Sequence, residues 1–185
     1  RDKLVDERLE SPEFNSYWAL KWSDFLRVDR QTLGHENAYQ YYSWLKESFR
    51  QHKPMAAFAR ELITTSGPLV DAPACFFYKA VKSPNRMAST MSQVMLGIRI
   101  ECAECHHQPF DRWGQTDFFG MRAFFAQVSY KKSSRGEMLI AQGNPVTKHP
   151  RTGETIQAFA LGTQMPTVNP LNDRRDELAN WLTAP

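Results

Sequence analysis

Long apolar runs are missing from this chain. No hydrophobic stretch approaches the roughly 18 to 20 residues that cross a bilayer, so we expect no transmembrane segment. The N-terminus, which runs from Arg1 to Arg8 and is mostly charged, also lacks the pattern of a secretory signal. The chain begins without Met inside a predicted helix, which indicates an excerpt or a processed piece of a longer protein.

Cysteine is scarce as well. The chain has three cysteines, Cys75, Cys102 and Cys105, and an odd number makes a simple disulfide framework a poor explanation for them. Cys75 lies among apolar neighbours, and we interpret it as a small buried hydrophobic residue. The close pair is therefore the candidate chemical site.

An excess of one charge is absent too. The formal net charge is +3, and the basic residues are spread along the sequence instead of forming a stripe. This pattern excludes the electrostatic footprint of a nucleic-acid binder, so we expect no nucleic-acid partner. Glycine-rich phosphate loops, G-x-S-x-G and H-E-x-x-H are also missing.

The first two-thirds of the chain carries helical periodicity, because apolar side chains recur there at spacings of three and four. Ser11-Pro12 and Ser83-Pro84 are typical of helix starts, and Ser66-Gly67-Pro68 is typical of a stop. Residues 96–100 could equally form a short strand. The expected helices span about Pro12 to Leu26, Glu36 to Gln51, Met55 to Ile63, Ala74 to Val81, Pro84 to Ile98 and Thr116 to Val128.

From about Lys131 the chain is interrupted every few residues by glycine or proline, which leaves room only for short strands such as Glu137 to Ala141. We expect a mainly α fold: an irregular multi-helix domain over residues 1–130, with an irregular β and loop arm over 131–171 packed on it. Asn172-Asp173 could cap a last helix, Arg174 to Thr183. That helix, in residues 172–185, either closes this domain or begins the next one.

The strongest motif is Cys102-Ala103-Glu104-Cys105-His106, the C-x-x-C-H attachment sequence of c-type haem. Two thiols three residues apart on a helical turn can each form a thioether with a vinyl group on one edge of the porphyrin, and the next residue then stands over the iron. By residue frequencies this pentapeptide arises by chance in roughly one chain per thousand of this length. We therefore expect one covalent haem c, with His106 as the proximal iron ligand.

Two other sites would use the same residues. A structural zinc site needs four ligands, usually as two close pairs, and no second pair follows this one. A thioredoxin-like redox pair needs βαβ surroundings, which the preceding helices do not provide.

The far side of the iron decides between functions, because a second strong ligand favours electron transfer whereas an open face can bind small ligands or activate peroxide. His149 on the arm and Met121 on the helix after the motif are the candidate distal ligands. His149 serves equally well as a turn residue, and a methionine at helical spacing is more often core filler.

Several side chains near the motif could line a haem pocket. Arg112 is a candidate partner for a haem propionate, with Asp111 and Asp117 as competing partners. His107 could serve as a propionate or outer partner, or simply be exposed. The aromatic residues beside the site could be pocket walls or general core: Phe110, Trp113, Phe118 and Phe119.

The motif and three other stretches together resemble the planctomycete cytochrome c-like domain family, whose function is unknown, over nearly the whole chain. The stretches are Phe14 to Val28, Lys53 to Leu62, Ser92 to Trp113 and His149 to Gly153. Asp173 to Thr183 resembles the start of the planctomycete-specific domain that usually follows. Family members often carry a histidine where this sequence has Gln108.

The resemblance implies a secreted or periplasmic multidomain protein in which this domain holds haem c. We therefore expect an extracytoplasmic domain that carries single electrons to redox partner proteins or to other domains of a longer chain. A peroxidase-type enzyme or gas binder with an open distal face is the first alternative. A zinc-holding or metal-free interaction module is the second.

Overall fold

The computed structural model describes residues 2–109, 111–164 and 173–184. It is mainly helical, with small antiparallel sheets in the later part of the chain, which confirms the predicted fold class. Within the described residues no helix is both long and apolar enough to cross a membrane.

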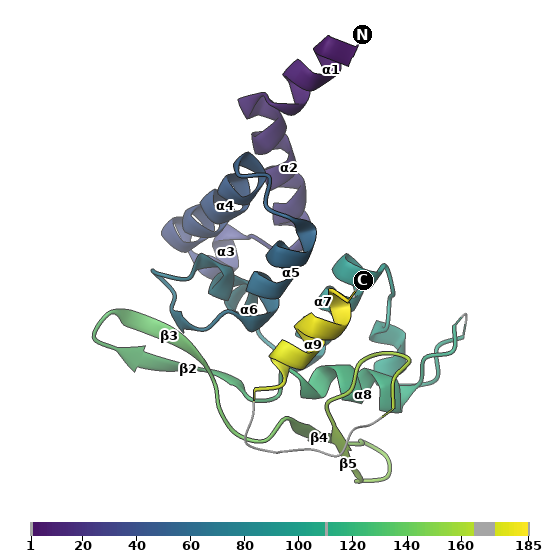
Figure 1. Cartoon of the computed structure of the whole chain (residues 1–185). Helices are drawn as coiled ribbons and strands as arrows, with labels where there is room; N and C mark the ends of the chain where they lie inside the picture. The colour runs from purple at the N-terminus through teal and green to yellow at the C-terminus, as the bar shows by residue number, and fades with distance from the viewer. Residues whose placement is uncertain (1, 110, 165–172, 185) are drawn as a thin grey trace.

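The N-terminal half is a layer of packed helices (Figure 1). Helix α1 buries none of its residues and leads away from the body, whereas α2 packs along α4. Ser11 caps α2, because its hydroxyl accepts from the backbone N–H of Phe14 at 3.2 Å. The helices are α1 (Asp2–Leu9), α2 (Pro12–Phe25), α3 (Arg30–Leu33), α4 (His35–Arg50) and α5 (Met55–Thr64).

A second set of helices precedes and follows the motif: the 3₁₀ turn η1 (Pro73–Cys75), α6 (Phe76–Val81), α7 (Pro84–Leu96), the 3₁₀ turn η2 (Glu101–Glu104) and α8 (Gln115–Ala123). The alternative of a strand over residues 96–100 is wrong. Gly97 adopts a left-handed conformation with φ of 70°, and the N–H of Ile98 donates to the carbonyl of Ser92 at 3.2 Å. This pair of features closes α7 as a Schellman-type cap.

Helix α8 is shorter than the sequence pattern predicts. It ends at Ala123, and tight i to i−3 hydrogen bonds follow it, including one from the N–H of Phe125 to the carbonyl of Arg122 at 3.0 Å. Val128 pairs with Ala141 in a sheet instead of extending the helix. The buried aromatic residues after Ala123 mimic a helix face because a tight turn also directs them into the core.

Two small antiparallel sheets form the arm. The first has the order β1-β3-β2, from β1 (Gly67–Pro68), β2 (Val128–Ser133) and β3 (Gly136–Ala141), and the second pairs β4 (Val146–Lys148) with β5 (Thr155–Gln157). The expected strand over Glu137 to Ala141 is confirmed, and the strand partner at Gly67–Pro68 was not predicted.

The arm returns to the helical body through Phe159. Its ring lies so close to Gly120 of α8 that a Cβ atom there would sit 2.3 Å from it, and its N–H donates to the Gly120 carbonyl at 3.3 Å. Residues 158–161 are all buried. Glycine at position 120 is therefore required by the close approach of the arm.

The last helix, α9 (Arg175–Leu182), packs on α5 through the buried Leu178 and Ala179. The helix begins one residue after the expected start, with Arg174 at the N-cap position, and Asp173 accepts from the N–H of Arg175 at 3.0 Å. Asn172, the other expected cap residue, lies outside the described residues.

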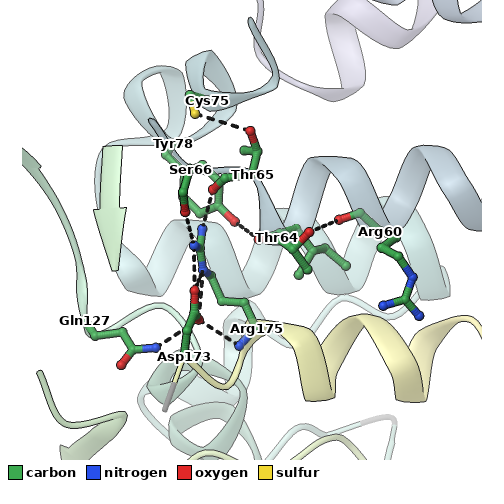
Figure 2. A network of polar contacts seen from close by, with 10 residues as sticks. Arg60, Thr64, Thr65, Ser66, Cys75, Tyr78, Gln127, Asp173 and Arg175 are labelled. Atoms are coloured by element: carbon green, nitrogen blue, oxygen red, sulfur yellow. Dashed lines mark hydrogen bonds and ion pairs between the residues drawn. The ribbon is translucent and has the colours of Figure 1, made fainter. Parts of the chain in front are cut away.

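A buried arginine joins α9 to the rest of the fold (Figure 2). The Arg175 side chain is fully buried and donates to the Thr65 carbonyl at 2.9 Å, to Ser66 Oγ at 2.8 Å and to Asp173 at 2.7 Å. Asp173 also accepts from Gln127 at 3.0 Å. The corner where α5 ends, the β arm begins and α9 starts is thus a single polar cluster.

Beside this cluster lies Cys75, which is fully buried, as predicted. Its sulfur contacts Thr65 Oγ1 at 3.3 Å, and burial raises the pKa of the thiol above its ordinary value. Cys75 is therefore a poor nucleophile in the folded protein.

We expect Arg175→Ala to lower the free energy of unfolding by about 3 kcal/mol, because it removes one partner of a buried pair and leaves buried acceptors without donors. Urea denaturation followed by circular dichroism measures this. Arg135→Ala is the control, because that residue belongs to an exposed ion pair with Asp71 and its loss should change stability far less. Equal losses in the two variants would contradict the structural role of Arg175.

Candidate functional site

The Cys102–His106 motif begins on η2, between α7 and α8, and continues into the residues just after it. Ile100 and Ala103, three residues apart, are both fully buried and anchor the turn to the core. Cys102 and Cys105 lie on the outer side, and both are free and exposed. Both thiols are therefore accessible to a reagent or a ligand at the surface.

His106 is exposed, and its Nδ1 lies 2.7 Å from the carbonyl oxygen of His107. A carbonyl oxygen can only accept a hydrogen bond, so Nδ1 must carry the proton. In the neutral ring Nε2 is then unprotonated and keeps a free lone pair. This is the arrangement of a metal-ligating histidine, whose second nitrogen donates to a backbone carbonyl.

Gln115, at the start of α8, holds the end of the turn. Its Nε2 donates to the carbonyls of Glu104 at 3.0 Å and Cys105 at 3.1 Å. These carbonyls end a turn too short to satisfy them within itself. Sequence reasoning missed Gln115, because a glutamine at a helix start has no distinctive signal.

Glu104, the second variable residue of the motif, is anchored by a polar chain. Its carboxylate accepts from Asn85 Nδ2 at 2.6 Å, and Asn85 Oδ1 accepts from Arg122 Nε at 2.5 Å. Arg122 Nη1 donates in turn to Thr147 Oγ1 on β4. The motif is thereby connected to α7, α8 and the arm, a connection that no sequence pattern indicated.

The predicted propionate partner Arg112 is exposed, and its guanidinium lies 4.4 Å from the centre of the Trp113 ring. Neither Asp111 nor Asp117 forms an ion pair with it, and within the part of the chain that the structure describes no other carboxylate does. The Arg112 charge is thus free to meet an anion.

The proposed aromatic walls are largely occupied in the core. Trp113, Phe118 and Phe119 are all buried and belong to the main hydrophobic cluster, while Phe110 lies outside the described residues. In the loop that follows the motif, Trp113 Nε1 and Gln108 Oε1 are buried and have no hydrogen-bond partner among the described residues. That loop therefore holds one donor and one acceptor that a bound group could satisfy.

The two candidate distal ligands are engaged elsewhere. Met121 is 1% exposed and part of the hydrophobic core, so its sulfur could reach a surface ligand only after leaving the core. His149 lies at the start of the β4–β5 turn, and its Nδ1 accepts from the backbone N–H groups of Arg151 at 3.2 Å and Thr152 at 3.3 Å. In a neutral ring Nε2 then carries the proton and has no lone pair to give to iron.

The residues of the motif do not converge on a single point. Across residues 2–109, 111–164 and 173–184, no three His, Cys, Asp or Glu side chains are grouped so that they could hold a metal ion. A tetrahedral zinc site of the closed structural type would need four such ligands around one ion.

A cavity of about 540 Å³ lies between the end of α2, α3 and α7, and its lining extends to Glu101, the residue before Cys102. The charged residues that line this cavity have both signs: Asp24, Asp29 and Glu101 are negative, and Arg27 and Arg86 are positive. The surface beside the motif is therefore polar and hollowed on this side.

The described geometry predicts the reactivity of the thiols. Ellman's reagent should modify Cys102 and Cys105 rapidly in the folded protein without attached haem, and Cys75 only after unfolding, because Cys75 is buried with a raised pKa. The measurement is absorbance against time with and without guanidinium. Cys75→Ala should keep the fast phase and lose the slow one; three fast thiols in the parent protein would contradict the buried position.

Comparison with known proteins identifies the family. The family model PSCyt2, described as a protein of unknown function (DUF1549), matches residues 1–130, from α1 into β2, and so includes the whole motif and its supports on α7 and α8. The expected start of a further planctomycete domain at residues 173–183 lies outside this match and stays a prediction. No curated protein and no solved structure gives a match. Since the matched residues are more than half of the chain, this protein belongs to the planctomycete-associated PSCyt2 family of unknown function.

Proposed function

We propose that this domain binds one haem c covalently through Cys102 and Cys105, with His106 as the proximal iron ligand, and that it carries single electrons. The observation that supports this most directly is the contact between His106 Nδ1 and the His107 carbonyl on a C-x-x-C-H turn, because it leaves Nε2 free for iron.

The two cysteines are suited to attachment because both are free and exposed. Each thiol adds across one vinyl group: sulfur bonds to one vinyl carbon and the hydrogen goes to the other. The addition needs no oxidant or reductant. Anchoring by two thioethers means that the protein need not enclose the ligand in a deep apolar pocket to retain it.

The residues around the turn would hold the ligand's polar groups. Among the residues that the structure describes, the Arg112 guanidinium in the loop after the motif has no ion-pair partner, and the buried N–H of Trp113 has no acceptor. Both are donors that a haem propionate could accept from. Bound haem would supply one-electron chemistry at its iron, with a potential governed by the axial ligands and surrounding charges.

Covalent attachment of haem c also implies a location for the domain and a class of partner. Haem c is normally attached outside the cytoplasm, so the domain would work in an extracytoplasmic or periplasmic setting. Exposed attachment residues would leave an edge of the ligand near the surface, where electrons can pass to redox partner proteins or to other domains of a longer chain.

A second function is favoured by the positions of His149 and Met121. Because Met121 is buried in the core and His149 Nδ1 accepts two hydrogen bonds, neither presents a free lone pair at the surface. An iron with no second protein ligand can bind a small molecule. Ligand binding or a peroxidase-type activity is therefore the alternative to electron transfer.

The first experiment is expression with the c-type haem maturation machinery, followed by intact mass and a reduced pyridine haemochrome spectrum. We expect the mass of one haem added to the chain and a c-type band. An unmodified mass would contradict the proposal and favour a structural or interaction role.

Cys102→Ala combined with Cys105→Ala is the matched variant. It should retain the fold, because both side chains are exposed, and should lose all covalent haem to acid organic solvent. Cys75→Ala is the control and should still carry covalent haem. Covalent haem in the double variant would show that the anchors lie elsewhere.

The distal face is tested with His149→Ala. We expect its haem spectrum to match that of the parent protein, and the reduced protein to bind carbon monoxide, because the tautomer of His149 leaves it no lone pair for iron. Absorbance spectra of the ferric, ferrous and carbon monoxide forms measure this. A changed ferric spectrum together with carbon monoxide binding only in the variant would instead identify His149 as the distal ligand.

A further inference from the structure

The polar chain beneath the motif joins two opposite charges through one amide. Asn85 donates from Nδ2 to the Glu104 carboxylate at 2.6 Å and accepts at Oδ1 from Arg122 Nε at 2.5 Å. Its orientation follows from its neighbours, because a guanidinium only donates and a carboxylate only accepts. If the amide were flipped, its NH₂ group would face the Arg122 N–H donor and its oxygen would face the Glu104 carboxylate.

Neither charged end is neutralised directly. Within residues 2–109, 111–164 and 173–184, neither Glu104 nor Arg122 has an oppositely charged group within 4.0 Å. Asn85 therefore keeps the two charges apart while connecting them. Glu104, the negative end, lies within the Cys102–His106 motif. Arg122, the positive end, lies on α8 and is connected to Glu104 only through Asn85.

Arg122 is held partly out of water. Its side chain is half-buried, burial lowers the pKa of the guanidinium, and the Glu104 charge acts in the opposite direction. Its guanidinium lies 6.0 Å from the centre of the Phe119 ring, and that ring lies 6.2 Å from the ring of His149. A charge in such surroundings is screened less than one at the open surface.

We propose that Asn85 and Arg122 are positioning residues of the haem site: they hold Glu104, and with it the Cys102–His106 turn, against α7, α8 and β4, and they set the reduction potential through the two charges they connect. This inference rests on the proposed haem attachment. It assigns a role to Asn85, Glu104 and Arg122, none of which is specified by the C-x-x-C-H pattern.

The sign of each charge effect follows from electrostatics. Reduction adds one negative charge to the haem, so a nearby cation stabilises the reduced state and raises the potential, and a nearby carboxylate lowers it. A role limited to supporting the fold has a different signature, because removal of either end would loosen the same turn and move the potential in the same direction.

The experiment compares the midpoint potentials of haem-loaded variants by spectroelectrochemical titration. Arg122→Gln should lower the potential and Glu104→Gln should raise it, although both should lower the thermal midpoint of unfolding. Arg122→Lys keeps the charge but not the forked donor, so it should keep the potential near that of the parent while losing stability. Asn85→Ala should lower the yield of covalent haem, because it releases the turn.

Arg135→Gln is the control, since this exposed arginine on the β2–β3 hairpin pairs with Asp71 and its replacement should leave the potential unchanged. Shifts of the same sign in Arg122→Gln and Glu104→Gln, or none in either, would overturn the inference. Failure of the underlying haem proposal is distinguishable, because the parent protein would then carry no covalent haem by mass. If Arg122→Gln does not load haem, Glu104→Gln and Arg122→Lys still decide the outcome.

Discussion

The Cys102–His106 turn has few hydrogen bonds of its own, and the arrangement of the site depends on how it is held from outside. Two fully buried residues, Ile100 and Ala103, anchor its inner side. Gln115 satisfies its terminal carbonyls, and Asn85 holds the carboxylate of Glu104. Helices α7 and α8 thus provide a rigid frame, and the exposed thiols and imidazole can face outward without loss of order. We expect this arrangement, in which buried helices hold the turn and exposed side chains bind, when a ligand is anchored at a surface by covalent bonds.

Local backbone contacts explain why the tautomers of the two candidate iron ligands differ. In His106 the ring nitrogen nearer the backbone faces an acceptor, and in His149 the corresponding nitrogen faces two donors. The local backbone therefore selects opposite tautomers without any help from a metal. The sequence alone cannot distinguish these two cases, because the tautomer depends on which backbone groups each ring contacts in the fold.

Much of the fold could be predicted from the sequence because its signals are local. Ser11-Pro12 and Ser83-Pro84 begin helices, and Gly97 ends the second of them, through backbone chemistry within a few residues. The end of α8 could not be predicted, because a buried tight turn and a helix give the same apolar spacing there. β1 was missed because its two residues become a strand only by pairing with β3, about 70 positions later. The chain from Glu104 to Arg122 was missed for the same reason, since polar contacts across helices leave no periodic trace.

The buried Arg175 has a consequence for the order in which the protein folds. Its partners at Thr65 and Ser66 precede it by 110 and 109 residues, so the α5 corner closes by one of the most distant contacts in the chain. Contacts of such sequence separation carry a large loop-closure entropy and form late unless other structure has already shortened the loop. During synthesis from the N-terminus, the motif and its supporting helices are complete before Arg175 is added. The Cys102–His106 turn can therefore reach its native form while the corner that completes the core is still open to water.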